Sequence, residues 1–242
     1  MIESALARQA VVVAMLLGAG ALSWLDAARS QPRRADMGFW FEDVAFESVR
    51  LGGALTAADV ATIRSTAASE VAQAFGGLAI HVSDRRDARY RVRVVQEVRD
   101  LRFRRAVGVA GESRAVSGFG GSGSVSFFFL ASSAMAYAPP GADRAALLEA
   151  IGRGVGRSAV HEFTHQLLPT APIHASKDAG SYEYASAARP AQYVGPMHWD
   201  LAWPLLRRKI GASGRLVNSL DTPAPELDLP RERYWAVPGA DR

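Results

Sequence analysis

Two histidines four residues apart stand out in the segment His161-Glu162-Phe163-Thr164-His165. On a helix, side chains at this spacing lie nearly one above the other, so both imidazoles can bind one metal ion, with Glu162 beside them. Zinc is the metal that two such histidines with an adjacent glutamate typically hold. The segment therefore predicts a Zn²⁺ site with Glu162 as the general base and acid of a hydrolytic reaction.

A hydrolytic zinc site also needs a third protein ligand and an open position for water. The chain has no cysteine, so the third ligand must be a histidine, an aspartate or a glutamate. Three residues after the segment compete for this position: His174, Asp178 and Glu183. We favour His174, because Pro169 and Pro172 predict a turn that could return it to the metal. The expected ligands are therefore His161, His165 and His174, with Asp178 and Glu183 as open alternatives.

The pattern resembles the metzincin group of zinc metallopeptidases, whose HExxHxxGxxH motif is followed by a methionine-containing turn. The resemblance covers about residues 44–199 and rests on the HEFTH segment, a later histidine and Gly195-Pro196-Met197-His198-Trp199. Two positions depart from it, since Leu168 stands at the family's glycine and Ala171 at its third histidine. The resemblance implies a zincin-like fold and a zinc-dependent endopeptidase that cleaves peptide or protein substrates.

Other interpretations of the same residues remain open. One is a gluzincin-like peptidase in which Glu183 is the third ligand, and another is a non-catalytic, metal-stabilised binding protein of the cell envelope. A third is that HEFTH is ordinary helix with both histidines on a polar stripe. If the protein is a peptidase, the groups that could stabilise the oxyanion are Tyr182, Tyr184, Tyr193 and His198. Asp178 could instead orient a metal-binding imidazole.

The elements that must position this site predict an α+β fold in which a small mixed sheet packs on two long helices. Thr56 and Asp59 form a capping-box pattern at the start of the first helix, and Gly76-Gly77 ends it. Asp143 can cap a second helix that runs to about Leu168 and carries HEFTH. Its glycines at 152, 154 and 156 predict close backbone packing or a break.

Apolar and alternating segments predict the strands. They comprise an extended edge element made of the aromatic run 39–41 and the segment 44–51, followed by 78–82, 90–95 and 125–130. The glycine- and serine-rich stretch 108–124 predicts a flexible loop that could border the cleft. A short amphipathic helix is expected over 200–210, ended by Gly211.

The ends of the 242-residue chain differ from its middle. Residues 10–25 carry no charge, so 1–30 are predicted to be a signal peptide or an N-terminal membrane anchor. We expect a linker over 31–43, one catalytic domain over 44–211 and an extended tail over 212–242. The apolar run predicts that the protein is exported to the periplasm or secreted. It could also anchor the protein to the membrane.

Net charge is +4 and the arginines are mostly scattered, so no nucleic-acid partner is expected. The sequence does not predict an oligomeric state.

Overall fold

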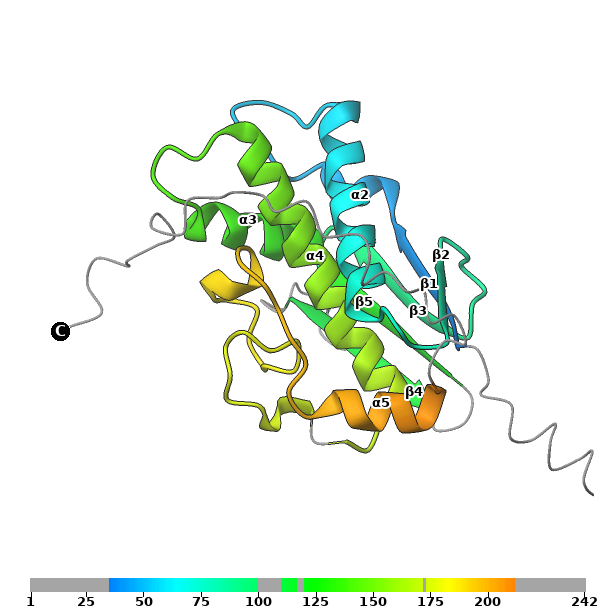
Figure 1. Cartoon of the computed structure of the whole chain (residues 1–242). Coiled ribbons are helices and arrows are strands. Elements are labelled where there is room, and N and C mark those ends of the chain that lie inside the picture. Colours follow the sequence, from blue (N-terminus) through cyan, green and yellow to red (C-terminus); the bar gives the residue numbers. More distant parts are fainter. Residues whose placement is uncertain (1–34, 100–109, 117–119, 172, 212–242) are drawn as a thin grey trace, which may run out of the picture.

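The computed structural model describes residues 35–99, 110–116, 120–171 and 173–211. They form a five-stranded mixed sheet with the two long helices side by side across one face (Figure 1). This arrangement confirms the α+β class. The predicted signal segment, the tail and most of the arginines near residue 100 lie outside the described residues.

The sheet has the strand order β2-β1-β3-β5-β4. The strands are β1 (Ala35–Phe41), β2 (Ile80–Ser83), β3 (Tyr90–Val95), β4 (Gly111–Val116) and β5 (Gly120–Ser126). Neighbours pair in parallel except for β4, which lies antiparallel to β5 at one edge. An antiparallel edge strand therefore ends the sheet on the side of β5.

Four described helices accompany the sheet: α2 (Ala57–Ala74), α3 (Phe127–Tyr137), α4 (Arg144–Leu167) and α5 (Ala202–Ile210). Three 3-10 turns are η1 (Asp43–Phe46), η2 (Ile173–Ala175) and η3 (Pro190–Gln192). The predicted capping box is confirmed, because Thr56 and Asp59 each accept a hydrogen bond from the other's backbone N–H. Asp143 caps α4 by accepting from the Ala146 N–H at 2.7 Å.

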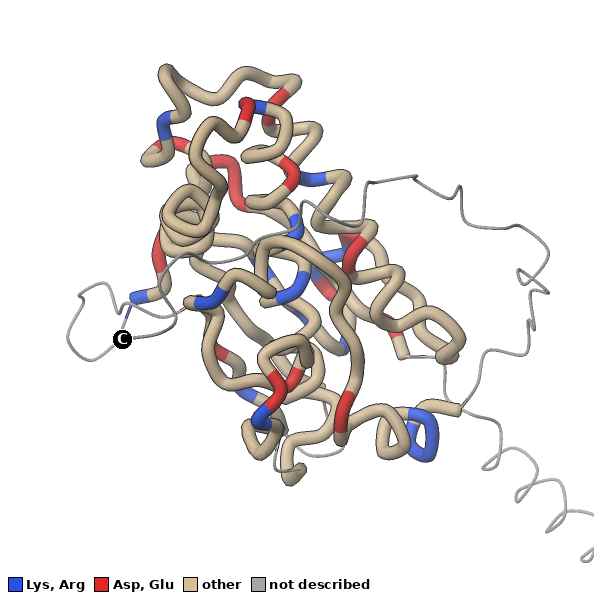
Figure 2. Tube along the Cα trace, turned by 60° about the vertical axis from the view of Figure 1, so that its left-hand side comes forward, with Lys and Arg blue, Asp and Glu red and all other residues tan. Residues whose placement is uncertain are grey.

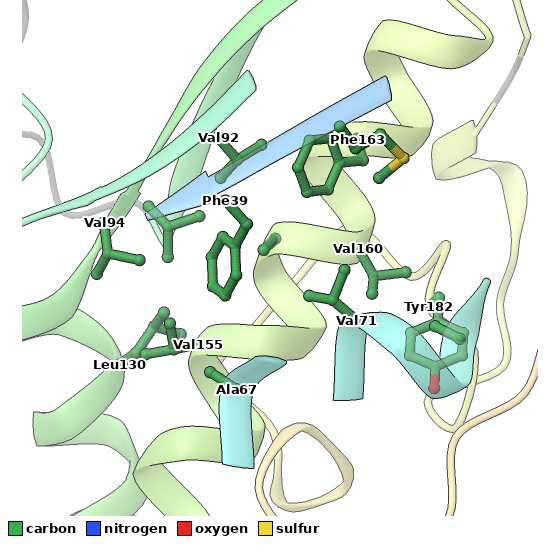
Figure 3. Packing of buried hydrophobic residues seen from close by; sticks show 14 of the residues in the cluster. Phe39, Ala67, Val71, Val92, Val94, Leu130, Val155, Val160, Phe163 and Tyr182 are labelled. Atoms are coloured by element: carbon green, nitrogen blue, oxygen red, sulfur yellow. The ribbon is translucent and has the colours of Figure 1, made fainter. Parts of the chain in front are cut away.

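The core lies between the sheet and the helix pair, where aliphatic and aromatic side chains from both layers meet (Figure 3). The glycines of α4 allow this close contact. A Cβ at Gly156 would lie 2.6 Å from the Ala67 carbonyl oxygen of α2, and one at Gly154 would lie 2.5 Å from the Tyr193 ring. The predicted close packing of this helix is confirmed, and the helix continues without a break.

The described part of the glycine- and serine-rich stretch, 110–116 and 120–124, is mostly strand rather than loop, so the prediction was wrong for these residues. Its described residues form β4 and most of β5. The small residues are needed because α4 lies against them: a Cβ at Gly121 would come within 2.5 Å of the Gln166 side chain. Low side-chain volume here indicates a covered sheet face rather than a flexible segment.

The predicted strand over 125–130 was also wrong beyond its first two residues. Ser126 ends β5 and accepts a hydrogen bond from the Phe129 N–H at 3.3 Å, which starts α3. Phe127 is fully buried, whereas Phe128 remains exposed. Three consecutive phenylalanines are typical of a buried strand, but here they begin a helix that Ser126 caps.

The sheet starts earlier than predicted. Residues 35–41 form β1, so the run 39–41 is extended as predicted, but the strand begins within the predicted linker and lies in the interior of the sheet between β2 and β3 rather than at an edge. The segment 44–51, predicted to be extended, instead begins with η1. Met37 and Phe39 are buried on one face of β1, whereas Asp36 and Trp40 on the opposite face are only half-buried, as expected for a strand covered by helices on one side.

Acidic and basic residues are interspersed along the described chain, and Figure 2 shows one basic run, Arg207-Arg208-Lys209, at the end of α5. Within the described ranges, no helix is both long and apolar enough to span a bilayer.

Candidate metal centre

The last two turns of α4 bring His161 and His165 together with His174 of η2. Their Nε2 atoms are 3.1 Å apart for His161 and His165, and each lies 3.0 Å from the Nε2 of His174. Among the described residues, the group consists of these three nitrogens without a carboxylate, and it could hold one metal ion. The predicted return of His174 to the other two histidines is thus present in the structure.

The turn after α4 explains how His174 reaches the helix. The helix ends at Leu167, and the Leu168 N–H still bonds to the Thr164 carbonyl at 2.8 Å. The chain then reverses, and buried Ile173 fixes η2 against the core. His174 itself is exposed, so it faces the cavity while its neighbour anchors the segment. Pro172 lies outside the described residues.

His161 is held in an orientation suited to metal binding. Its Nδ1 lies 2.8 Å from the Tyr182 carbonyl oxygen, and a carbonyl can only accept, so Nδ1 carries the proton and Nε2 presents its lone pair. Burial lowers the pKa of His161 to about 4, and burial also lowers the pKa of His165. Both imidazoles are therefore neutral at pH 7, the form that binds metals.

The spacing of the three nitrogens suits a small tetrahedral ion. Zinc–nitrogen bonds of about 2.05 Å at tetrahedral angles require ligand nitrogens about 3.3 Å apart. The observed 3.0–3.1 Å is slightly shorter, so small rotations of the imidazoles would meet this requirement. Three imidazole ligands also match the donor preference of zinc, whereas a hard cation would need a site built from oxygen ligands.

Glu162 is buried beside the histidines, with 6% of its surface exposed. Burial is the main cause that raises the pKa of its carboxyl, a hydrogen bond with Ser113 lowers it, and nearby Glu112 raises it slightly. The net pKa is about 8. Gly111 of β4 approaches so closely that a Cβ there would lie 2.6 Å from Glu162 Oε1. The carboxyl is therefore enclosed between α4 and the edge strand.

Side-chain hydrogen bonds fix α4 on the sheet at this point. The Ser113 hydroxyl donates to the Glu162 carbonyl at 3.0 Å and accepts from the Gln166 amide at 3.1 Å. Gln166 also donates to the Arg91 carbonyl and accepts from the Arg91 N–H, at 2.9 and 3.0 Å. The position of Glu162 relative to β4 is thus set by polar contacts as well as by packing.

The three histidines and Glu162 line one cavity of about 440 Å³. Its other walls are the start of β4, Phe129 of α3, and the segment that runs from Tyr182 to Gln192. This volume is in the range of ordinary ligand pockets. The site therefore combines metal-binding nitrogens, a carboxyl with a raised pKa and space for a ligand.

The two alternative third ligands lie elsewhere and serve other purposes. Glu183 is fully buried and accepts hydrogen bonds from the Asp200, Leu201 and Ala202 N–H groups at the start of α5. Asp178 accepts from the Gly180 N–H at 2.7 Å and pairs with His198 at 2.9 Å. In this structure neither joins the histidine set, and the Tyr182 carbonyl, not Asp178, orients a histidine.

The four candidates for oxyanion stabilisation are separated by the fold. Tyr182 and Tyr184 line the cavity of the histidines. Tyr193 is buried against Tyr137 and α4, and His198 is bound to Asp178. Tyr182 is itself largely buried, and burial raises its hydroxyl pKa to about 12. Tyr184, which lines the cavity and is not largely buried, is thus the remaining candidate for oxyanion stabilisation.

Met197, expected in a turn beneath the metal, lines a different cavity of about 840 Å³ together with Trp199 and Trp203. It is half-buried against the core. The three histidines are not among the lining residues of this larger cavity.

Sequence reasoning missed three contributors to the site: the Tyr182 carbonyl, Gly111 and Arg189. A backbone carbonyl leaves no signal in residue types. Gly111 stood in a stretch that its composition marked as a loop, and Arg189 resembled any scattered arginine.

Comparison with known proteins gave no match: no family model, no curated protein and no solved structure is significantly similar to this chain.

Proposed function

We propose that this protein is a zinc-dependent metallopeptidase of the zincin type, with His161, His165 and His174 as ligands and Glu162 as general base and acid. The observation that carries this proposal is the convergence of three Nε2 atoms beside one buried carboxyl in a single cavity. The resemblance to metzincins, in the HEFTH segment and a later third histidine, supports it.

The chemistry divides between the ion and the chain. When bound, zinc lowers the pKa of water towards 7 and polarises a carbonyl oxygen. Glu162 takes the proton of the attacking water and passes it to the leaving amine. Without the ion, burial raises its pKa to about 8; a cation held by the adjacent histidines would favour the ionised carboxylate, which is the form that accepts the proton of water.

The outer edge of β4, which pairs with no other described strand, supports a peptide as the substrate. One edge of this strand pairs with β5, and Gly111, Glu112 and Ser113 line the cavity beside Glu162. An extended peptide can add to such an edge through main-chain hydrogen bonds, which places its backbone without regard to its sequence. A carbonyl held there would lie near both the histidines and Glu162.

The second candidate is a protein of the cell envelope that binds metal for stability without catalysis. The exposed position of His174 and the short chain reversal that carries it are compatible with a metal that fastens η2 to α4. The raised pKa of Glu162 favours the peptidase, since a purely structural site has no need of a buried protonatable carboxyl.

The experiment is to measure zinc content and peptide hydrolysis for the wild type and for Glu162→Gln. We expect about one zinc per chain in both, and a loss of hydrolysis of about 10²–10⁴-fold in the variant. Equal cleavage by the variant and the wild type would contradict the proposed role of Glu162 and with it the peptidase mechanism. Zinc in both proteins with cleavage in neither, over a mixed peptide library, would favour the structural site.

A further inference from the structure

Arg189 is a buried cation in the wall of the cavity that holds the histidines. Only 7% of its surface is exposed, and it precedes η3 in the segment opposite β4. Burial lowers the pKa of its guanidinium. Arginine is almost never fully buried unless it is paired, so its partners decide what it does.

The partners of Arg189 are neutral. Its two terminal nitrogens donate to the Ala179 carbonyl, to the Ser181 carbonyl at 3.0 Å and to the Gln192 Oε1 at 3.1 Å. Its Nε has no hydrogen-bond partner within the described part of the chain. In the same ranges, no carboxylate lies within ion-pair distance of it. The closest acid that acts on its charge, Asp178, is already bound to Gly180 and His198.

This cation is directly coupled to the metal centre. Arg189 binds the Ser181 carbonyl, and the next carbonyl along the chain, that of Tyr182, binds His161. The positive charge of Arg189 is one of the smaller causes of the lowered pKa of His161. The ring of Tyr184 lies 4.7 Å from the guanidinium carbon and forms the adjacent part of the cavity wall. A group that occupies the cavity beside the histidines therefore comes close to a positive charge whose direct partners are all neutral.

We propose that Arg189 makes this cavity select a carboxylate on the peptide substrate, close to the bond that is cleaved. This inference rests on the proposed peptidase function and names its substrate class. The carboxylate can come from an Asp or Glu side chain that flanks the cleaved bond, or from the free C-terminus of the peptide. Both offer the same chemistry to the guanidinium.

The physical reason is that folding has already removed water from Arg189, while Asp178 acts on its charge only from beyond ion-pair distance and is itself hydrogen-bonded to Gly180 and His198. A carboxylate that enters the cavity is desolvated itself, but it gains the attraction of a cation whose desolvation costs it nothing further. A neutral amide of the same shape gains much less. Charge-assisted hydrogen bonds are worth about 1.5–3 kcal/mol, which corresponds to roughly ten- to a hundredfold in affinity or in kcat/KM.

The first test uses the wild type and peptides that differ in one residue. Peptides with amidated C-termini carry Glu, Gln or Leu on either side of the cleaved bond, and a second set compares a free C-terminus with an amide. In the first set, we expect kcat/KM to be about ten- to a hundredfold higher for the Glu peptide than for the Gln peptide. Alternatively, in the second set, kcat/KM should be higher by the same factor for the free C-terminus than for the amide. The set that responds identifies the source of the carboxylate. Cleavage with no preference in either set overturns the inference and leaves the peptidase intact.

The second test measures binding and needs no turnover. Zinc-loaded Glu162→Gln is titrated with the Glu and Gln peptides by calorimetry, alone and combined with Arg189→Met or Arg189→Lys. We expect the preference to vanish with Met and to persist in part with Lys, because Lys retains the charge. Arg86→Met is the matched control, since it removes the same charge from an exposed turn between β2 and β3.

Thermal unfolding shows whether each variant is folded. If Arg189→Met does not fold, Arg189→Lys and the wild-type ratio still decide the question. A preference that survives in folded Arg189→Met, or that disappears in Arg86→Met, overturns the assignment to Arg189.

Discussion

Two neighbouring regions of this molecule contain the same residue types and use them in different ways. The cavity beside α4 holds Glu162 and His174, and the region around the start of α5 holds Glu183 and His198. Glu183 is the more deeply buried of the two glutamates, and the cavity that His198 lines is nearly twice as large.

The difference lies in what each side chain is bonded to. Glu183 accepts hydrogen bonds from three backbone N–H groups, so its charge is used to start a helix that has no side-chain cap of its own. Glu162 has a raised pKa because burial is not balanced by such donors. His198 is bound to Asp178, whereas His174 faces two other imidazoles. Burial and cavity size therefore do not identify a reactive site; uncompensated polar groups do.

Removal of one histidine from each region gives the largest contrast. We expect His174→Ala to weaken zinc binding by about a hundred- to a thousandfold, because structural zinc sites gain about 10–16 kcal/mol from four ligands, or about 2.5–4 kcal/mol for each. His198→Ala is the matched control and should retain wild-type affinity. Competition with a fluorescent chelator measures both. If His198→Ala loses zinc and His174→Ala does not, the assignment of the two regions is reversed.

The two glutamates should respond in opposite ways when stability is measured. Glu183→Ala leaves the N–H groups at the start of α5 without their acceptor, and we expect a loss of about 2–3 kcal/mol in the free energy of unfolding. Metal-free Glu162→Gln should be at least as stable as the wild type, since it removes a buried carboxyl that lacks such donors. Urea unfolding of the metal-free proteins makes the comparison. A larger loss for Glu162→Gln than for Glu183→Ala would contradict it.

The last expected effect is a pH dependence of stability that Glu162 contributes. Its folded-state pKa is raised from 4.5 to about 8, so the folded metal-free protein keeps a proton that the unfolded chain releases. This contribution to stability is complete below about pH 4.5 and is lost as the pH rises towards 8. Relative to Glu162→Gln, the wild type should lose up to about 1.4 kcal/mol per pH unit between roughly pH 5 and 7.

The comparison with Glu162→Gln cancels the contribution of the buried histidines, whose lowered pKa values act in the opposite direction. Parallel stability curves for the two proteins would show that Glu162 is exposed to water in solution.

Much of the helical part of the fold could be predicted, because its signals are local. Thr56 with Asp59, Asp143, and Gly211 each act on backbone groups within a few residues, so the helix starts and the end of α5 followed from the sequence. The wrong predictions concern segments whose structure depends on packing between residues that are distant in the sequence. Glycines that make room for Gln166 of α4 have the same composition as a flexible loop.

The sequence by itself determined that His161 and His165 share one helix face, with Glu162 between them, because the period of a helix fixes that geometry. Only the tertiary structure placed His174, rather than Asp178 or Glu183, beside His161 and His165, since this depends on how the chain reverses after α4 and where α5 begins. It also raised the pKa of Glu162 and left Arg189 with neutral hydrogen-bond partners, because burial and pairing are properties of the packed molecule.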